Sequence, residues 1–157
     1  MERYLVDFDG VILDSQKKFD EAMKDTTDFD IWYNYLNSIN WHEFYASCDE
    51  IDDAFNSLNR LQEKKKLKAI LTAIHSFEEG NEKALILRNN KIYVPIIFVL
   101  PNQDKSIIYP PMDEDILIDD KEKNCKDFEN AGGKALLFRP KINYDSKKTV
   151  KSLKELL

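Results

Sequence analysis

The sequence has few cysteines, few glycines and no long apolar run, which argues against a disulfide-rich protein and a membrane protein. It contains two cysteines and four glycines among 157 residues. Cys48 and Cys125 do not make a disulfide framework and lack the spacing of a metal site, which favours two reduced thiols in a cytoplasmic protein. The longest apolar run, Val94 to Leu100, is far short of the ~20 residues that cross a membrane. We therefore expect no membrane insertion, and no signal peptide, since Glu2 and Arg3 precede only a few apolar residues.

Basic residues are fewer than acidic ones. The chain has 23 lysines and arginines against 29 acidic residues, a formal charge of -6. Long nucleic acid requires a basic surface, so we expect no such partner. A small anionic ligand remains compatible, because one bound divalent cation inverts the local field. No repeat or flexible linker divides the chain, and its length suits about one domain.

Short apolar segments recur along the chain. They are Tyr4 to Phe8, Lys68 to Thr72, Val94 to Leu100, Asp115 to Ile118 and Lys134 to Phe138. Several are continuously apolar, which is typical of strands that are covered on both faces of a parallel sheet. Helical patterns lie between some of them. The sequence therefore predicts an α/β fold, a Rossmann-like parallel sheet with helices on both faces.

Three helices are expected in the second half of the chain. Ser76 and Glu79 have the spacing of a capping box and open one helix. A second helix spans Lys121 to Ala131 and is stopped by the two glycines that follow. A third is expected over Ser146 to Leu157, where apolar residues recur at helical spacing.

Residues 15–66 interrupt the alternation of strands and helices. Apolar positions in this stretch predict three amphipathic helices, the third opened by a capping box at Ser47 and Glu50. We interpret 15–66 as a small all-helical cap inserted after the first strand, and 1–14 with 67–157 as the α/β core domain.

Asp7 and Asp9 are the first candidate site residues. They leave the carboxyl end of an expected strand, where open α/β sheets bind ligands. Like charges this close repel each other unless a cation or a raised pKa accommodates them. The alternative is an acidic turn in which Gly10 supplies the bend.

Asp119 and Asp120 form a second acidic pair at the end of another expected strand. A helix follows, and its N-terminus favours nearby anionic groups. The alternative is that Asp120 simply caps this helix.

Two further candidates follow other strands. Thr72 can donate a hydrogen bond to a phosphoryl oxygen, or it can merely end its strand. Lys105 can neutralise a phosphoryl group and hold a carboxylate, or it can be a solvated loop residue. Lys83 is a weaker candidate because it lies inside an expected helix.

In this order along the chain, the motifs resemble those of the haloacid dehalogenase-like (HAD) hydrolase superfamily. Its four motifs correspond here to Asp7 and Asp9, Thr72, Lys105, and the Asp119–Asp120 pair. The segments Asp-Phe-Asp-Gly-Val and Ile-Asp-Asp are the more specific matches. The resemblance covers the whole chain, since residues 15–66 fall where a small helical cap falls in that superfamily.

The resemblance implies a phosphatase, because phosphatases of the superfamily carry an aspartate two residues after the nucleophile, as Asp9 follows Asp7. Asp7 is then the nucleophile that forms an aspartyl-phosphate, and Asp9 is the general acid and base. Thr72, Ala73 and Lys105 would bind the phosphoryl group. The implied cofactor is Mg²⁺, held by Asp7, the main-chain carbonyl of Asp9 and Asp120, with Asp119 in a supporting role.

The expected substrate is a small phosphorylated metabolite, and the motifs look most like the 5'-nucleotidase and deoxyribonucleotidase branch. Three alternatives remain open. A non-catalytic phosphate- or Mg²⁺-binding module would not need Asp9. A phospho-accepting receiver domain would not place its acceptor on the first strand. A 3'-phosphatase of nucleic-acid ends is disfavoured by the acidic balance. The oligomeric state is open.

Aromatic and histidine residues give weaker signals. Trp32 and Tyr33 are assigned to the core of the insert because of their helical spacing; Trp41, Phe44 and Tyr45 are kept as a candidate substrate wall. His75 is interpreted as a loop histidine, and His42 has no ligand partner at a useful spacing.

Overall fold

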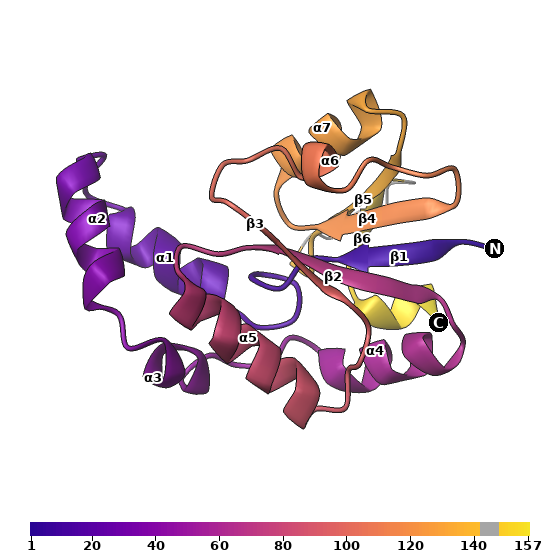
Figure 1. Ribbon diagram of the computed structural model, residues 1–157, viewed down its shortest axis with the longest axis horizontal. Coiled ribbons are helices and arrows are strands. Elements are labelled where there is room, and N and C mark those ends of the chain that lie inside the picture. Colours follow the sequence, from indigo (N-terminus) through magenta and orange to yellow (C-terminus); the bar gives the residue numbers. More distant parts are fainter. Residues whose placement is uncertain (142–147) are drawn as a thin grey trace.

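The computed structural model describes residues 1–141 and 148–157. Within them, six strands form one parallel sheet in the order β3-β2-β1-β4-β5-β6 (Figure 1). The strands are β1 (Arg3–Val6), β2 (Leu67–Ala73), β3 (Ile96–Val99), β4 (Asp115–Asp119), β5 (Lys134–Phe138) and β6 (Thr149–Val150). This confirms the expected α/β fold.

β1 is the point where the order of strands reverses. From β1 the chain passes to β2 and β3 on one side, and then returns to β4, β5 and β6 on the other. A reversal of this kind opens a ligand site at the carboxyl ends of the central strands. Val6 pairs in register with both Ile70 and Ile118. The residues that follow β1, β2 and β4 therefore lie close together at one edge of the sheet.

Helices cover both faces of the sheet. The helices of the described residues are α1 (Ser15–Met23), α2 (Phe29–Ser38), α3 (Trp41–Ala46), α4 (Ala54–Glu63), α5 (Phe77–Asn89), α6 (Lys105–Ile108), α7 (Glu122–Asn130) and the 3-10 helix η1 (Leu153–Leu156). In Figure 1, α4, α5 and η1 lie below the sheet, and α6 and α7 lie above it. Successive residues of a strand face opposite sides, so Val6 packs in the cluster that holds Leu58, while Leu5 packs with Phe128 of α7.

The connection between β1 and β2 contains four helices, one more than the sequence predicts. The capping box at Ser47 and Glu50 is wrong, because Ser47 ends α3 and α4 begins only at Ala54. Before α4 the chain turns through Asp53, which has a φ of 58° and makes no side-chain cap. Glu50 accepts a hydrogen bond from the main-chain N–H of Phe55 at 2.9 Å instead.

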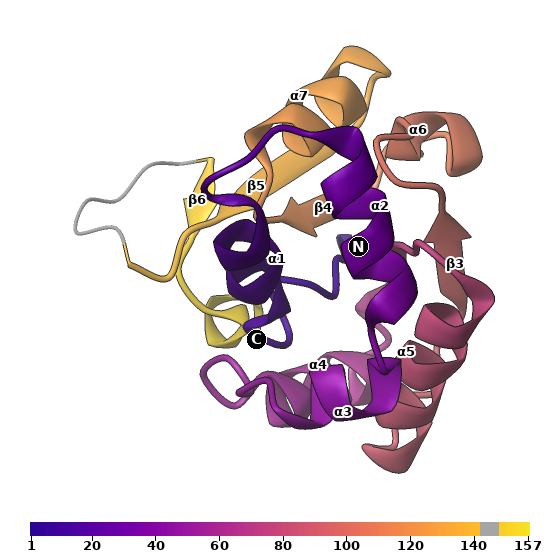
Figure 2. The ribbon, with the colours of Figure 1, turned by 90° about the vertical axis from the view of Figure 1, so that its left-hand side faces the viewer.

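The helices α1 and α2 lie at the carboxyl edge of the sheet and face the viewer in Figure 2. Phe19 of α1 packs against Trp32 of α2 and Phe44 of α3, with ring centroids 6.0 Å and 4.9 Å apart. Tyr33 is 54% exposed, so its assignment to the core of the insert is wrong; it stacks on the exposed Phe29 along the outer face of α2. The boundary of the insert at residue 66 stays a prediction.

The expected helix over Ser146 to Leu157 is wrong in its described part, and Ser146 itself lies outside the described residues. Val150 belongs to β6, where it pairs in register with Phe138 of β5. Only Leu153–Leu156 is helical, as a 3-10 turn. The apolar spacing is satisfied by a strand residue followed by one buried turn, so it does not require a continuous helix.

The other two helices of this half are confirmed. Ser76 accepts a hydrogen bond from the N–H of Glu79 at 3.2 Å and caps α5. α7 buries Phe128, and the chain passes so close beneath its ring that a Cβ on Gly133 would lie 2.5 Å from it. Glycine is therefore required where α7 leads into β5.

Both thiols are unpaired, with Cys48 half-buried and Cys125 buried. Among the helices of the described residues, none combines the length and apolar character needed to cross a membrane.

We expect Phe128→Ala to lower the free energy of unfolding by about 3–5 kcal/mol, because it leaves a cavity in a fully buried site. Phe77→Ala makes the same change on a side chain that is 84% exposed, and should cost less than about 0.5 kcal/mol. Urea unfolding of both variants would measure the difference, and equal losses would contradict the assignment of the core.

Candidate active site

The turn after β1 begins the site. The N–H of Asp7 continues the sheet by donating to the carbonyl of Ile118 at 2.9 Å, and the chain then turns back on itself through Gly10, whose φ is 78°. A Cβ on Gly10 would lie 2.2 Å from Oδ2 of Asp120. The absence of a side chain at position 10 thus allows the carboxylate of Asp120 to approach the turn.

Three carboxylates converge beside this turn. One oxygen each from Asp7, Asp119 and Asp120 lies within 4.8 Å of the others. Burial, opposed by the charge of Lys105 and reinforced by the neighbouring carboxylates, raises the pKa of Asp7 to about 6. Burial and the charges of Asp7 and Asp119 raise the pKa of Asp120 to about 8. A cation bound here would relieve the repulsion among these carboxylates.

The residues present fit a magnesium ion. Oδ1 of Asp120 is buried and has no hydrogen-bond partner, as expected of an oxygen that would complete its contacts with a metal. Mg²⁺ commonly uses one or two carboxylates and leaves its other positions to water or substrate. Asp119 is already engaged by three other residues: Lys105, the main-chain N–H of Lys121, and Asn124. This leaves Asp7 and Asp120 as the better ligands.

Lys105 lies between two of these carboxylates. Its Nζ is 3.0 Å from Oδ1 of Asp7 and 2.6 Å from Oδ2 of Asp119, and it also donates to the carbonyl of Leu71 at 2.9 Å. Burial acts to lower the pKa of Lys105, but the two carboxylates outweigh it, and the pKa is raised. The connection from β3 to β4 contains only the four-residue α6, which begins at Lys105 and directs it to the site.

Asp9 is held by three side chains. Oδ1 accepts hydrogen bonds from Ser15 at 2.6 Å and from Tyr45 at 3.0 Å. Oδ2 accepts one from Lys83 at 2.7 Å. Tyr45 comes from α3 and Lys83 from α5, so separate elements converge on this carboxylate.

Lys83 is the weaker of the two candidate lysines in the sequence, because it lies inside an expected helix. The structure places both lysines at the strand ends. Besides Asp9, Lys83 donates to Oγ1 of Thr72 at 2.9 Å and to the carbonyl of Ala73 at 2.7 Å, and it lies 2.9 Å from Oε2 of Glu79. The spacing of Glu79 and Lys83, four residues apart on one helix, is the signal that could have identified the pair.

Glu79 links Lys83 to the insert and to His75. Burial acts to raise the pKa of Glu79, but hydrogen bonds from His75 and the charge of Lys83 dominate and lower it to about 2. Oε1 lies 2.7 Å from Nδ1 of His75, and Oε2 accepts a hydrogen bond from Tyr45 at 3.2 Å. Burial and the charges of Asp9 and Glu79 raise the pKa of Tyr45 well above its usual value, so its hydroxyl remains a donor.

A small pocket of about 150 Å³ opens beside Asp9. Its wall includes Ala73, His75 and, from the insert, Phe19 and Trp32. Trp32 packs against the core, as its spacing predicts, and also lines this pocket. Of the candidate substrate wall, Trp41 and Tyr45 are buried. His42 forms an exposed pair with Glu82.

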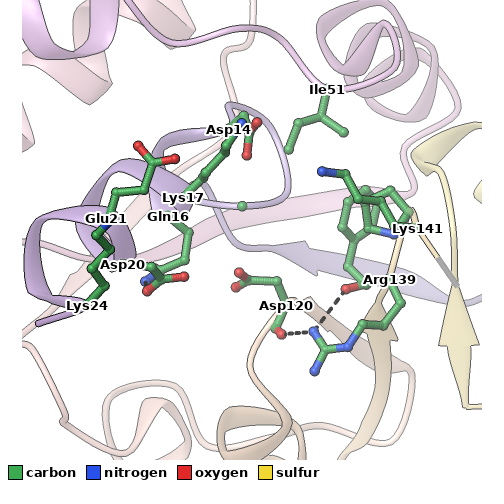
Figure 3. Close-up of a pocket in the computed structure, with 13 residues that line it drawn as sticks. Asp14, Gln16, Lys17, Asp20, Glu21, Lys24, Ile51, Asp120, Arg139 and Lys141 are labelled. Carbon is green, nitrogen blue, oxygen red and sulfur yellow. Dashed lines mark hydrogen bonds between the residues drawn. The ribbon is translucent and has the colours of Figure 1, made fainter.

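A larger hollow of about 530 Å³ lies between Asp120 and the residues of α1 (Figure 3). Arg139 binds the main-chain oxygen of Asp120 there, and the carboxylate of Asp120 points away from Arg139 toward α1. Acidic and basic side chains alternate around this hollow, from Asp14, Lys17, Asp20 and Glu21 to Lys141.

Neither a protein-family model nor a curated protein sequence matches the chain. Solved structures do match its fold. A haloacid dehalogenase-like family hydrolase from Streptococcus pneumoniae aligns with a TM-score of 0.69 at 13% identity, over 99% of this chain and 96% of that one. A HAD-superfamily hydrolase of subfamily IA from Geobacter sulfurreducens aligns with a TM-score of 0.67 at 14% identity, over 99% and 97%.

The magnesium-bound HAD-hydrolase YfnB of Bacillus subtilis aligns with a TM-score of 0.60 at 16% identity, over 99% of this chain and 96% of that one. At such identities the likeness establishes the fold alone. The chain therefore has the fold of the haloacid dehalogenase-like hydrolases, as its motifs imply.

Proposed function

We propose that the protein is a Mg²⁺-dependent phosphatase that hydrolyses a small phosphate monoester through an aspartyl-phosphate. The observation that carries this proposal is the placement of two differently surrounded carboxylates on one turn. Asp7 lies with Lys105 and the acidic pair, whereas Asp9 lies at a pocket with hydrogen-bond donors on both oxygens. Two carboxylates in different surroundings can take different roles, one as a nucleophile and the other as a proton shuttle.

Each residue has a chemical role in this proposal. A carboxylate oxygen of Asp7 forms a bond to phosphorus as the bond to the leaving oxygen breaks, and Asp9 gives its proton to that oxygen. Asp9 then takes a proton from the water that attacks the aspartyl-phosphate and releases inorganic phosphate. Thr72, Ala73 and Lys105 bind the phosphoryl oxygens. Asp7 and Asp120 would hold the Mg²⁺, which when bound would supply positive charge to neutralise the phosphoryl group.

The pocket beside Asp9 supports a small leaving group. Its volume of about 150 Å³ and its aromatic wall, including Trp32, suit a compact, partly apolar group. A nucleotide of the kind hydrolysed by the 5'-nucleotidase branch would have to extend beyond this pocket toward solvent. The acidic balance of the chain favours a free metabolite over long nucleic acid.

We expect Asp7→Asn to abolish phosphate release, by at least about 1000-fold, because an amide is not a nucleophile here. Release from a panel of nucleotides and sugar phosphates would be measured with Mg²⁺ and with excess chelator. Asp127→Asn makes the same change on α7, where Asp127 pairs with Lys123, and should retain full activity. Turnover by Asp7→Asn equal to that of the unmodified protein would refute the proposal. A folded, Mg²⁺-binding protein that hydrolyses nothing would indicate a non-catalytic module.

We expect the metal-free protein to lose stability as the pH rises from about 4 to 8. The folded-state pKa values of Asp7, about 6, and Asp120, about 8, both exceed the ordinary 3.8. The folded chain therefore binds more protons than the unfolded chain in this interval, and the free energy of unfolding falls with increasing pH. Thermal unfolding in chelator across this pH range would show the trend.

Asp120→Asn should raise the Tm of the metal-free protein at pH 8 by roughly 2–4 °C, because it removes one of the repelling charges. The same variant should lose the increase in Tm that Mg²⁺ gives the unmodified protein. Asp127→Asn is the matched control and should change neither value. Stabilisation of the Asp120 variant by Mg²⁺ at an unchanged concentration would show that Asp120 is not a ligand.

A further inference from the structure

Lys83 is a buried charge at the centre of the site. Its side chain is fully buried, and its Nζ lies within 2.9 Å of four oxygens from three parts of the chain. They belong to Asp9 after β1, Thr72 and Ala73 in β2, and Glu79 one turn earlier in α5. Burial of a lysine is costly, and a stable core does not require it, because an apolar side chain of similar volume could fill the space.

The directions of these hydrogen bonds give Lys83 a specific effect on Thr72. An ammonium group only donates, so the bond of 2.9 Å occupies a lone pair of the Thr72 hydroxyl. The hydroxyl proton stays available for another acceptor. Its hydrogen bond to the carbonyl of Ala73 is 3.5 Å long, at the limit of such a bond. Lys83 thus leaves Thr72 as a donor toward the place of a phosphoryl oxygen.

Lys83 also fixes the orientation of Asp9. The ammonium holds Oδ2 at 2.7 Å, while Ser15 and Tyr45 hold Oδ1, so the carboxylate cannot rotate without loss of a contact. Glu79 lies 2.9 Å from the same ammonium, so the single positive charge of Lys83 lies between two carboxylates. Lys105 is engaged by Asp7 and Asp119 and makes none of these contacts.

We propose that Lys83 is a positioning residue that holds the carboxylate of Asp9 and the hydroxyl of Thr72 in one fixed arrangement for phosphoryl transfer. This inference rests on the proposed phosphatase function. Lys83 acts through these two side chains and does not touch the transferred group. The acidic cluster of Asp7, Asp119 and Asp120 should bind Mg²⁺ equally well without Lys83.

The dependence of the rate on the leaving group tests this role. Phenyl phosphate and para-nitrophenyl phosphate have similar shapes, but phenolate is the poorer leaving group and depends more on a proton from Asp9. The ratio kcat/KM depends on the steps up to and including release of the phenol or para-nitrophenol, so it reports on the step in which Asp9 donates its proton. We expect Lys83→Met to lower kcat/KM for para-nitrophenyl phosphate about 10-fold, through Thr72, and for phenyl phosphate about 100-fold, through both residues.

Leu87→Ala is the matched structural control. Leu87 is fully buried one turn further along α5 and takes no part in the polar network. Its loss should lower the Tm and affect both substrates by the same factor. Lys83→Met leaves Asp9 and Glu79 with one partner fewer, and this loss could prevent folding. In that case the double variant Lys83→Met/Glu79→Gln is used, because it also removes the negative charge of Glu79. An unchanged ratio between the two substrates in the folded Lys83 variant would overturn the proposal.

Binding of orthovanadate in the presence of Mg²⁺ separates this inference from the phosphatase proposal. Lys83→Met should weaken orthovanadate about 10-fold, because Thr72 is no longer held as a donor, and should leave the Kd of Mg²⁺ alone unchanged. If the unmodified protein hydrolyses neither substrate, the phosphatase proposal fails, and weaker orthovanadate binding still supports positioning of Thr72. Equal orthovanadate affinity in the variant would overturn the positioning role. Weaker Mg²⁺ binding would also overturn it, by placing Lys83 in the metal site.

Discussion

The concentration of buried negative charge at one edge of the sheet is the constraint on which the site depends. The carboxylates of Asp7, Asp9, Asp119, Asp120 and Glu79 all lie there, at or near the carboxyl ends of β1, β2 and β4. Such a group is stable only if cations are built in beside it. Two buried lysines supply part of that charge, and the remaining repulsion, between Asp7 and Asp120, is where a divalent cation has most to stabilise.

The two lysines divide this edge into two halves. Lys105, carried by the short α6, joins Asp7 to Asp119 on the side of the acidic pair. Lys83, carried by α5, joins Asp9 to β2 on the side of the pocket. One turn of chain separates the carboxylates of Asp7 and Asp9, and each meets a different lysine. The same residue type therefore experiences two different surroundings within three positions of the sequence.

The sequence predicts the parts of this arrangement that are local. Continuous apolar runs locate the strands, and carboxylates directly after two of them identify Asp7 and Asp119 as neighbours, since parallel strands end at one edge. The contacts of Lys83 and Tyr45 are not local: they join residues 74 and 36 positions from Asp9. They form when α3 and α5 pack together beside the strand ends. The C-terminal segment fails for a related reason, because its apolar period suits either a helix or a strand followed by a turn.

Tyr45 gives the site a mechanical property. Its hydroxyl is within 3.2 Å of both Asp9 and Glu79, and its ring is packed edge-on against Phe8 beside the first strand. One rigid side chain of α3 thus connects the inserted helices to the two carboxylates that surround Lys83. A displacement of α3 would take one hydrogen bond from each carboxylate, while Lys83 would still contact both. The position of α3 and the contacts of Asp9 are therefore linked through one hydroxyl group, that of Tyr45.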